Sequence, residues 1–185
     1  MDHADHVGLL RPAVTTAGGT WADIGAGHGA FTLALADLLG PGGSIIAVDR
    51  DAGALAANAG AVAERFPATR LTTLVADMRG PLELPALDGL IAANSLHFVE
   101  RAEQPAAIAR LASHLRPGAP FVVVEYDADR GNPWVPHPFA ASSWPALAAS
   151  AGLVGAREVA RVPSRFLGAI HASVAFVATV PTDAR

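Results

Sequence analysis

Short apolar runs alternate with segments of helical periodicity along most of this 185-residue chain. The apolar runs predict strands over residues 20–25, 44–49, 70–77, 87–94 and 120–126. Helical spacing of apolar residues predicts helices over 30–40, 52–66 and 102–115, and a short helix over about 4–15 before the first strand. Strands that alternate with helices form a parallel sheet with both faces covered, so the pattern predicts an α/β fold.

The last third of the chain departs from this alternation. A loop rich in proline and aromatic residues (127–139) leads to a predicted helix at about 142–151 and to two strands at about 154–161 and 170–180. The segment "PSRFLG" between these strands is too short for a crossover helix, so the two strands are expected to pair antiparallel.

Composition argues against several classes of function. Apolar residues make up 51% and charged residues 16%, which is typical of a folded globule. No run approaches the roughly 18 apolar residues of a membrane span, and the N-terminus lacks the pattern of a signal peptide. Cysteine is absent, and no histidine or acidic cluster has metal-ligand spacing, so we expect a cytoplasmic protein without disulfides, metal or membrane contact. The net charge is −4 and the arginines are scattered, which disfavours nucleic acid as a partner.

The segment "DIGAGHGA" (23–30) joins the first predicted strand to the first predicted helix. In an α/β sheet this turn meets ligands at the carboxyl ends of the strands, and glycines allow the backbone to approach a ligand closely. The spacing fits two patterns: G-x-G-x-x-A, which is typical of dinucleotide sites, and G-x-G-x-G preceded by Asp23.

Three acids favour the second pattern. Asp23, Asp49 and Asp77 lie at or near the ends of the first three predicted strands and would form an acidic rim. Such a rim repels a pyrophosphate but attracts an ammonium or sulfonium group, and S-adenosylmethionine carries both. A carboxylate at position 49 can also accept hydrogen bonds from two ribose hydroxyls.

At these residues the chain resembles the class I S-adenosylmethionine-dependent methyltransferases, over about residues 20–180. The resemblance is carried by "DIGAGHG", "AVDRD" and "VADMRG", and further by "IAANSLHFV" and "LRPGAPFVVVEY". It implies a Rossmann-like, doubly wound sheet of seven strands in the order 3-2-1-4-5-7-6, mostly parallel with an antiparallel last strand and helices on both faces. It also implies S-adenosyl-L-methionine as the cofactor.

The resemblance further implies one domain over 1–185. Residues 1–19 would form a helical lid, 20–126 the cofactor-binding core and 127–185 the substrate side. Within the core, Asp23 and the backbone of Gly25–Gly29 would face the methionine part, Asp49 would hold the ribose and Asp77 the adenine amine. The cofactor-binding residues expected in this way are Asp23, Gly25, Ala26, Gly27, Gly29, Asp49, Arg50, Asp77, Met78 and Asn94.

The methyl acceptor is expected over the loops that follow the fourth, fifth and sixth strands. Methyl transfer needs alignment of the reactants, and it needs a base only if the acceptor must lose a proton early. His97 is the first candidate base, followed by His137 and Tyr126. Side chains that could contact the acceptor are Trp134, Arg161, Arg165 and Phe166. The two aromatic residues could instead pack in the core, and the two arginines could instead meet solvent or local carboxylates.

Large substrate-recognition insertions are missing, which favours a small-molecule acceptor or a site completed by the second subunit of a homodimer. A protein acceptor stays open. The segment "NSLH" lacks the N/D-P-P-aromatic tetrad of amino-directed methyltransferases, which disfavours nucleobases and glutamine as acceptors. Two alternatives remain: a non-catalytic protein that binds S-adenosylmethionine, and a nicotinamide-dependent oxidoreductase, against which Asp23 and the closing strand pair argue.

Overall fold

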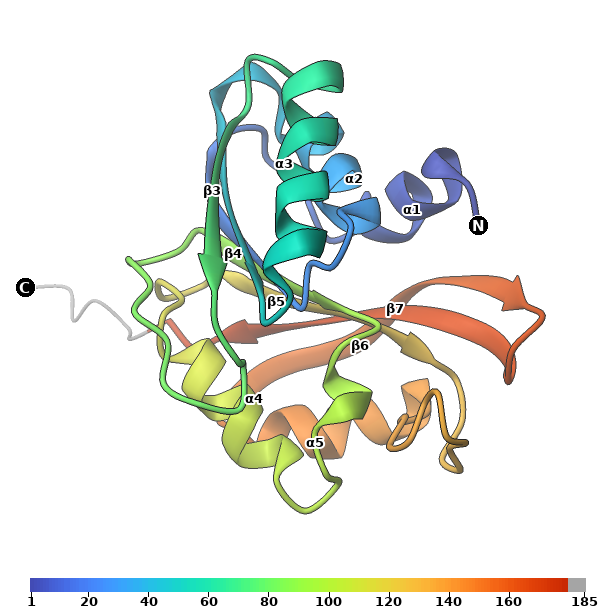
Figure 1. Cartoon of the computed structure of the whole chain (residues 1–185). Coiled ribbons are helices and arrows are strands. Elements are labelled where there is room, and N and C mark those ends of the chain that lie inside the picture. Colours follow the sequence, from blue (N-terminus) through green and yellow to red (C-terminus); the bar gives the residue numbers. More distant parts are fainter. Residues whose placement is uncertain (180–185) are drawn as a thin grey trace, which may run out of the picture.

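The computed structural model describes residues 1–179 and contains a seven-stranded sheet with the order β3-β2-β1-β4-β5-β7-β6 (Figure 1). The strands are β1 (Gly19–Ile24), β2 (Gly43–Asp49), β3 (Arg70–Val75), β4 (Gly89–Ala93), β5 (Pro120–Tyr126), β6 (Leu153–Ser164) and β7 (Gly168–Val177). The first five strands are mutually parallel, whereas β7 pairs antiparallel with both β5 and β6. The predicted strand order and the antiparallel closing pair are therefore confirmed.

Helices cover both faces of this sheet (Figure 1). Helices α1 (His3–Leu10), α2 (Ala30–Leu39) and α3 (Ala52–Arg65) lie on one face, and α4 (Gln104–Ala112) and α5 (Trp144–Ser150) lie on the other. Each face has its own core because alternate strand residues point to opposite sides. Val122 packs with Leu35 of α2 in one core, and its neighbour Phe121 packs with Trp144 of α5 in the other.

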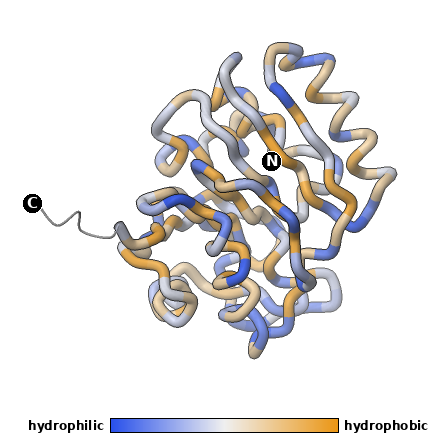
Figure 2. The backbone as a smooth tube through the Cα atoms, turned by 90° about the vertical axis from the view of Figure 1, so that its left-hand side faces the viewer, coloured by the Kyte–Doolittle hydropathy of each residue, from blue (hydrophilic) through white to orange (hydrophobic). Residues whose placement is uncertain are grey.

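Apolar stretches of the chain run through the interior strands, and hydrophilic stretches lie mainly on the outer turns and helix ends (Figure 2). The strands β4 and β5 are buried along most of their length, which explains why "LIAA" and "FVVVE" are almost continuous apolar runs. The connection 76–88 between β3 and β4 contains no helix, so the second core is closed there by apolar loop side chains, among them Leu82 and Leu84. No helix within residues 1–179 is long and apolar enough to cross a membrane.

Several elements differ in extent from the prediction. Helix α4 spans Gln104–Ala112 instead of 102–115, and strand β4 spans Gly89–Ala93 instead of 87–94. Helix α1 ends at Leu10 instead of near residue 15, because Pro12 has no N–H with which to continue the helix. Strand β6 continues to Ser164, so β6 and β7 form a longer hairpin that extends past the end of β5 (Figure 1). Helix α1 contributes Leu9 and Leu10 to the core beside Phe31, and its role as a lid stays a prediction. Residue 180 of the last predicted strand lies outside the described residues.

Candidate functional site

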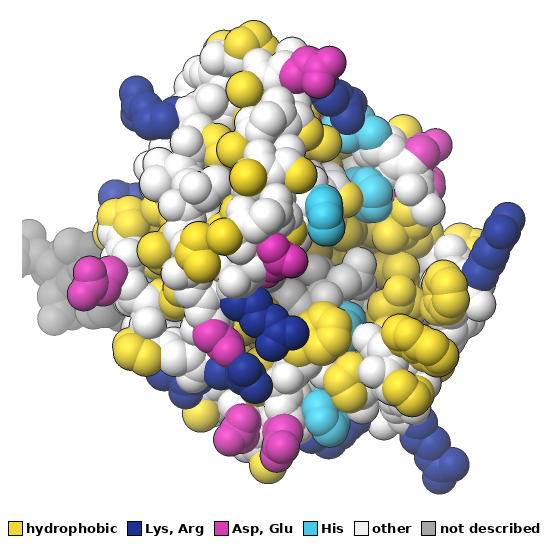
Figure 3. Space-filling view, in the orientation of Figure 1, with side chains coloured by type: hydrophobic (Ala, Val, Ile, Leu, Met, Phe, Trp, Pro, Cys, Tyr) yellow, Lys and Arg dark blue, Asp and Glu magenta, His cyan; other side chains and the backbone are white. Residues whose placement is uncertain are grey.

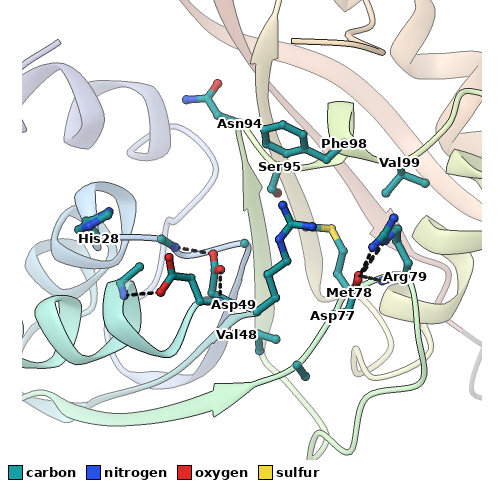
Figure 4. A pocket seen from close by; sticks show the side chains of 16 residues that line it. His28, Val48, Asp49, Asp77, Met78, Arg79, Asn94, Ser95, Phe98 and Val99 are labelled. Carbon is teal, nitrogen blue, oxygen red and sulfur yellow. Dashed lines mark hydrogen bonds and ion pairs between the residues drawn. The ribbon is translucent and has the colours of Figure 1, made fainter. Parts of the chain in front are cut away.

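A cavity of about 380 Å³ opens at the carboxyl ends of the parallel strands (Figure 4). This size falls within the range of small-molecule and cofactor sites. Of the predicted cofactor residues, it is lined by Gly25, Gly27, Asp49, Arg50, Asp77, Met78 and Asn94. It is also lined by His28, of which only the backbone was assigned to the cofactor from the sequence. The remaining lining residues were not assigned to the cofactor: Val48, Asp51, Ala54, Ala76, Arg79, Ser95, Phe98 and Val99.

The glycine loop forms one wall of the cavity. Gly25, Gly27 and Gly29 all have positive φ angles, of 74°, 50° and 92°, which L-residues with a side chain rarely adopt. Gly25 also passes so close to Ser95, after β4, that a Cβ on this glycine would overlap the serine side chain. Ser95 is fixed there because its hydroxyl donates to the Ile24 carbonyl at 2.8 Å.

Asp49 ends β2 and faces this loop (Figure 4). Its Oδ2 accepts a hydrogen bond from the Gly27 backbone N–H at 2.8 Å, and its Oδ1 accepts from the Asp51 backbone N–H at 2.9 Å. Asp51 in turn caps α3, accepting from the backbone of Gly53 and Ala54. The Asp49 carboxylate is therefore fixed in the cavity wall, with its negative charge beside the glycine loop.

The rim of the cavity carries arginines as well as acids. The Asp77 carboxylate accepts from the Arg79 Nε at 3.0 Å and from the Arg79 backbone N–H at 2.9 Å. These hydrogen bonds, the side-chain one first, lower the pKa of Asp77 to about 2. Arg50 lines the cavity beside this pair. The rim is consequently closer to charge balance than the three predicted acids suggested.

Asp23 occupies a different place from the other two acids. Its buried carboxylate accepts from the Thr32 hydroxyl of α2 at 2.6 Å, and Thr32 accepts from the Asn58 amide at 2.8 Å. Burial raises the pKa of Asp23 to about 7, against the effect of the Thr32 hydrogen bond. Asp23, Ala26 and Gly29 are not among the residues that line the cavity, so their predicted contacts with the methionine part stay predictions.

Asn94 follows β4 in the left-handed backbone region, with a φ of 50°, and lines the cavity. Its backbone N–H continues the sheet by donating to the Val124 carbonyl at 2.8 Å. Its side-chain Oδ1 is buried and accepts no hydrogen bond within residues 1–179. Because a buried acceptor without a partner is costly, Asn94 Oδ1 is a natural partner for a donor on a bound ligand.

Beside the cavity, a buried histidine pairs with a buried glutamate. His97 and Glu125 are only 3% and 1% exposed, and the His97 Nδ1 lies 2.9 Å and 3.0 Å from the two carboxylate oxygens. The ring of Tyr126 lies 6.1 Å from the His97 ring, and the His137 backbone N–H donates to the His97 carbonyl at 3.0 Å. The structure thus brings the Tyr126 ring and the His137 backbone close to His97.

Sequence reasoning missed Glu125. The available signal was a single charge at the end of the buried run "FVVVE", on a strand expected next to the one that precedes His97. Such a carboxylate must find a partner at the same sheet edge.

Three of the predicted acceptor residues, Trp134, Arg165 and Phe166, lie in loops or turns at the same end of the sheet, whereas Arg161 lies within strand β6. Trp134 is 80% exposed and Phe166, in the turn of the β6–β7 hairpin, is 68% exposed. Hydrophobic side chains gather on the right of the molecule in Figure 3, where this hairpin and the loop after β5 lie. Arg161 is ion-paired with Asp127 and, at 2.7 Å, with Glu158, whereas Arg165 is exposed. A contact of either arginine with the acceptor stays a prediction.

Fold and site together define a Rossmann-like methyltransferase domain. Residues 22–118 match the family model described as "Methyltransferase domain", which covers more than half of the chain. The chain belongs to this family, as the glycine motif and the strand-end acids predicted.

Solved structures support the same fold. The YcgJ protein from Bacillus subtilis is 14% identical with a TM-score of 0.73, and the match covers 96% of this chain and 100% of that one. The S-adenosylmethionine-dependent methyltransferase SibL is 18% identical with a TM-score of 0.74, over 96% of this chain and 55% of SibL. This chain therefore spans about half the length of SibL.

A third structure shows a bound ligand pair. The 1,6-didemethyltoxoflavin-N1-methyltransferase from Burkholderia thailandensis, solved with 1,6-didemethyltoxoflavin and S-adenosylhomocysteine, is 20% identical with a TM-score of 0.73. That match covers 96% of this chain and 78% of the Burkholderia enzyme. No curated protein matches the sequence significantly.

Proposed function

We propose that this protein transfers the methyl group of S-adenosylmethionine to a small-molecule acceptor. Family membership supports the reaction class, and the cavity at the carboxyl ends of the strands supports a site for the methyl donor. The Burkholderia enzyme, which has the same fold, is solved with 1,6-didemethyltoxoflavin and S-adenosylhomocysteine.

The observation that carries this proposal is the hydrogen bond from Gly27 N–H to Asp49 Oδ2. In a dinucleotide site, the N–H groups of the glycine loop bind the pyrophosphate. Here the Gly27 N–H is already bound to a carboxylate at 2.8 Å, so a pyrophosphate would meet a negative charge. A ligand whose ribose hydroxyls donate to Asp49 and whose charge is positive suits this arrangement.

The other lining residues fit the remaining parts of S-adenosylmethionine. Asn94 Oδ1 offers an unused acceptor to the amino group of the methionine part. Asp77 can accept from the adenine amine, and Met78 offers an apolar contact beside the ring. S-adenosylmethionine supplies the methyl group on its sulfonium. The lining residues would position the methionine end and the adenosine end of this donor.

Calorimetric titration tests the proposal, with S-adenosylmethionine, S-adenosylhomocysteine and NADH as ligands. We expect the first two to bind and NADH not to bind. Asp49→Ala should weaken binding of S-adenosylhomocysteine at least about tenfold, since two charge-assisted hydrogen bonds to the ribose are lost. Asp37→Asn, an exposed acid on α2 outside the cavity, is the matched control and should bind normally. Binding of NADH alone would contradict the proposed function and would favour a nicotinamide-dependent oxidoreductase instead.

A further inference from the structure

We infer that the methyl acceptor is a hydroxyl group on an apolar, aromatic body, and that His97, oriented by Glu125, removes its proton. This inference rests on the proposed function and specifies the acceptor of that same site.

Glu125 sets the orientation of the histidine. Glu125 lies at the end of β5, and its Oε1 also accepts from the Tyr126 backbone N–H at 2.7 Å, so the carboxylate is fixed by the main chain. A carboxylate beside Nδ1 selects the imidazole tautomer that carries the proton on Nδ1, which leaves the lone pair on Nε2. The Nε2 atom makes no hydrogen bond within the described part of the chain.

The His97–Glu125 pair lies next to the cofactor cavity. His97 belongs to the single 3-10 turn Leu96–Phe98 that follows β4, and the neighbouring residues Ser95 and Phe98 line the cavity. The rings of His97 and Phe98 are in contact, with centroids 4.4 Å apart. His97 therefore contacts Phe98, a residue that lines the cavity that would hold the methyl donor.

His97 differs in its surroundings from the other two base candidates. Burial, followed by the charge of Glu125, raises the pKa of Tyr126, so the phenol keeps its proton near neutral pH. His137 is held through its backbone, by the His97 carbonyl and by the Gln104 amide, and no carboxylate contacts its ring among residues 1–179. Of the three candidates, His97 alone has a carboxylate that can stabilise the positive charge acquired with a proton.

A histidine–carboxylate pair suits a hydroxyl as the accepting group. A neutral amine attacks the methyl carbon with its own lone pair and needs no prior loss of a proton. A thiol ionises near pH 8.5, whereas a phenol requires about pH 10, so a hydroxyl gains most from a positioned base. A buried pair that can become ionic also costs desolvation energy that an apolar pair would not, so its presence beside the cavity favours a chemical role.

Atoms and electrons balance in the transfer. The acceptor oxygen forms a bond to the methyl carbon while the carbon–sulfur bond breaks, and the electron pair of that bond stays on sulfur, which becomes a neutral thioether. The hydroxyl proton moves to His97 Nε2, and the Glu125 carboxylate balances the imidazolium charge. The proton then leaves to solvent.

Exposed aromatic side chains indicate the body of the acceptor. Phe98, Trp134 and Phe166 are 55%, 80% and 68% exposed, and they come from the loops after β4 and β5 and from the hairpin turn. Large aromatic side chains that stay exposed on three loops at one sheet edge favour an aromatic or other flat apolar ligand.

The test is a methylation panel in which benzene, naphthalene and quinoline skeletons each appear as the phenol, the amine and the thiol. Formation of S-adenosylhomocysteine and the methylated product are measured by mass spectrometry, on protein whose binding of S-adenosylhomocysteine has been established by calorimetry. We expect turnover of the phenols and little or none of the amines and thiols. Preferred turnover of amines or thiols would overturn the inference, as would no turnover of any compound by protein that binds S-adenosylhomocysteine. Failure to bind S-adenosylhomocysteine would instead overturn the proposed function beneath it.

Two variants test the dyad. His97→Asn keeps an N–H donor near the position of Nδ1 and lacks Nε2, so it should fold, bind S-adenosylhomocysteine normally and lose at least about 100-fold in kcat. Glu125→Gln should lower kcat about tenfold at unchanged KM and move the acidic limb of the kcat–pH profile to lower pH, which a structural brace would not do. His114→Gln, at the opposite edge of the sheet, is the control for histidine replacement and should leave kcat unchanged. A kcat within threefold of wild type for His97→Asn, or an unmoved profile for Glu125→Gln, would overturn the inference.

Discussion

Asn58 of α3 occupies the space that a side chain at Gly29 would need. A Cβ on Gly29 would overlap the Asn58 Oδ1, and Gly29 itself has a φ of 92° at the N-cap of α2. The same asparagine donates to Thr32, which donates to Asp23. The third glycine of the motif is therefore fixed by packing between two helices, whereas the first two line the cavity.

Gly29→Ala should destabilise the fold by about 3 kcal/mol. The left-handed backbone costs an alanine about 1–2 kcal/mol, and displacement of Asn58 costs about one further buried hydrogen bond. Gly27→Ala is the matched comparison, because Gly27 also has a positive φ but a Cβ there would meet no atom within 4 Å, so only the backbone cost applies. Urea unfolding measures the free energy of unfolding of both variants. Equal decreases would show that Asn58 can move aside without loss of stability.

Asp23 should make stability fall as pH rises from about 4 to 7. Its pKa is about 7 in the folded protein against 3.8 for the free side chain, so the folded state holds a proton that the unfolded state has released. The stabilisation is complete below the unfolded pKa and is lost as pH rises through the folded pKa, with a slope of up to about 1.4 kcal/mol per pH unit. Asp23→Asn should remove this slope.

Urea unfolding of wild type and Asp23→Asn at several pH values between 4 and 8 checks this expectation. Asparagine can still accept from the Thr32 hydroxyl, so the two proteins differ mainly in charge. A stability difference that does not change with pH would mean that Asp23 is ionised in the folded protein throughout.

Arg79→Ala should raise the affinity for S-adenosylmethionine about threefold. The variant frees the Asp77 carboxylate and removes a cation from the cavity wall. S-adenosylhomocysteine lacks the sulfonium charge, so its affinity should change less. Calorimetry with both ligands measures the difference, and Arg70→Ala, at the far end of β3, is the control. Weaker binding of both ligands would assign Arg79 a direct contact instead.

Gln104→Glu should destabilise the protein by about 3 kcal/mol. The buried Gln104 Nε2 donates to the carbonyl of His137 at 2.7 Å and lies 3.3 Å and 3.4 Å from those of Val99 and Leu96. A glutamate would place acceptor oxygens against three carbonyls, leaving buried polar groups unpaired. Gln104→Met, which loses the donor without adding an acceptor charge, should cost about 1–2 kcal/mol. Thermal unfolding compares the two variants. Equal stability would contradict the role of the Gln104 amide as a donor to these buried carbonyls.

The order of the elements was predictable because strand and helix periodicities differ and because glycine and proline mark the ends. Gly40 and Pro41 end α2 where the sequence indicates, and Asp51 caps α3. The end of α1 was not predicted, since its apolar residues continue past Pro12 to Val14 and both parts are buried. The apolar spacing in this segment reflects which residues are buried, and it does not show where helical hydrogen bonds end.

The site was predictable to the level of strand ends and no further. Parallel strands place Asp49, Asp77 and Asn94 at one sheet edge whatever the details, and all three line the cavity. The orientation of each side chain depends on a specific partner. Asp77 is held by Arg79, two residues along the chain. Asp23 is held by Thr32, nine residues away, and His97 by Glu125, 28 residues away. Such pairings require three-dimensional contacts that a single sequence does not specify.

The β6–β7 hairpin touches the rest of the molecule mainly through β7, and its turn at Arg165–Leu167 lies past the end of the sheet. Under the prediction that Arg165 and Phe166 contact the acceptor, we expect amino-acid changes in this turn to alter the acceptor site while leaving the sheet, the cores and the glycine loop in place. Acceptor preference and fold stability can therefore change independently in this chain, and the turn is the natural place to graft a new specificity.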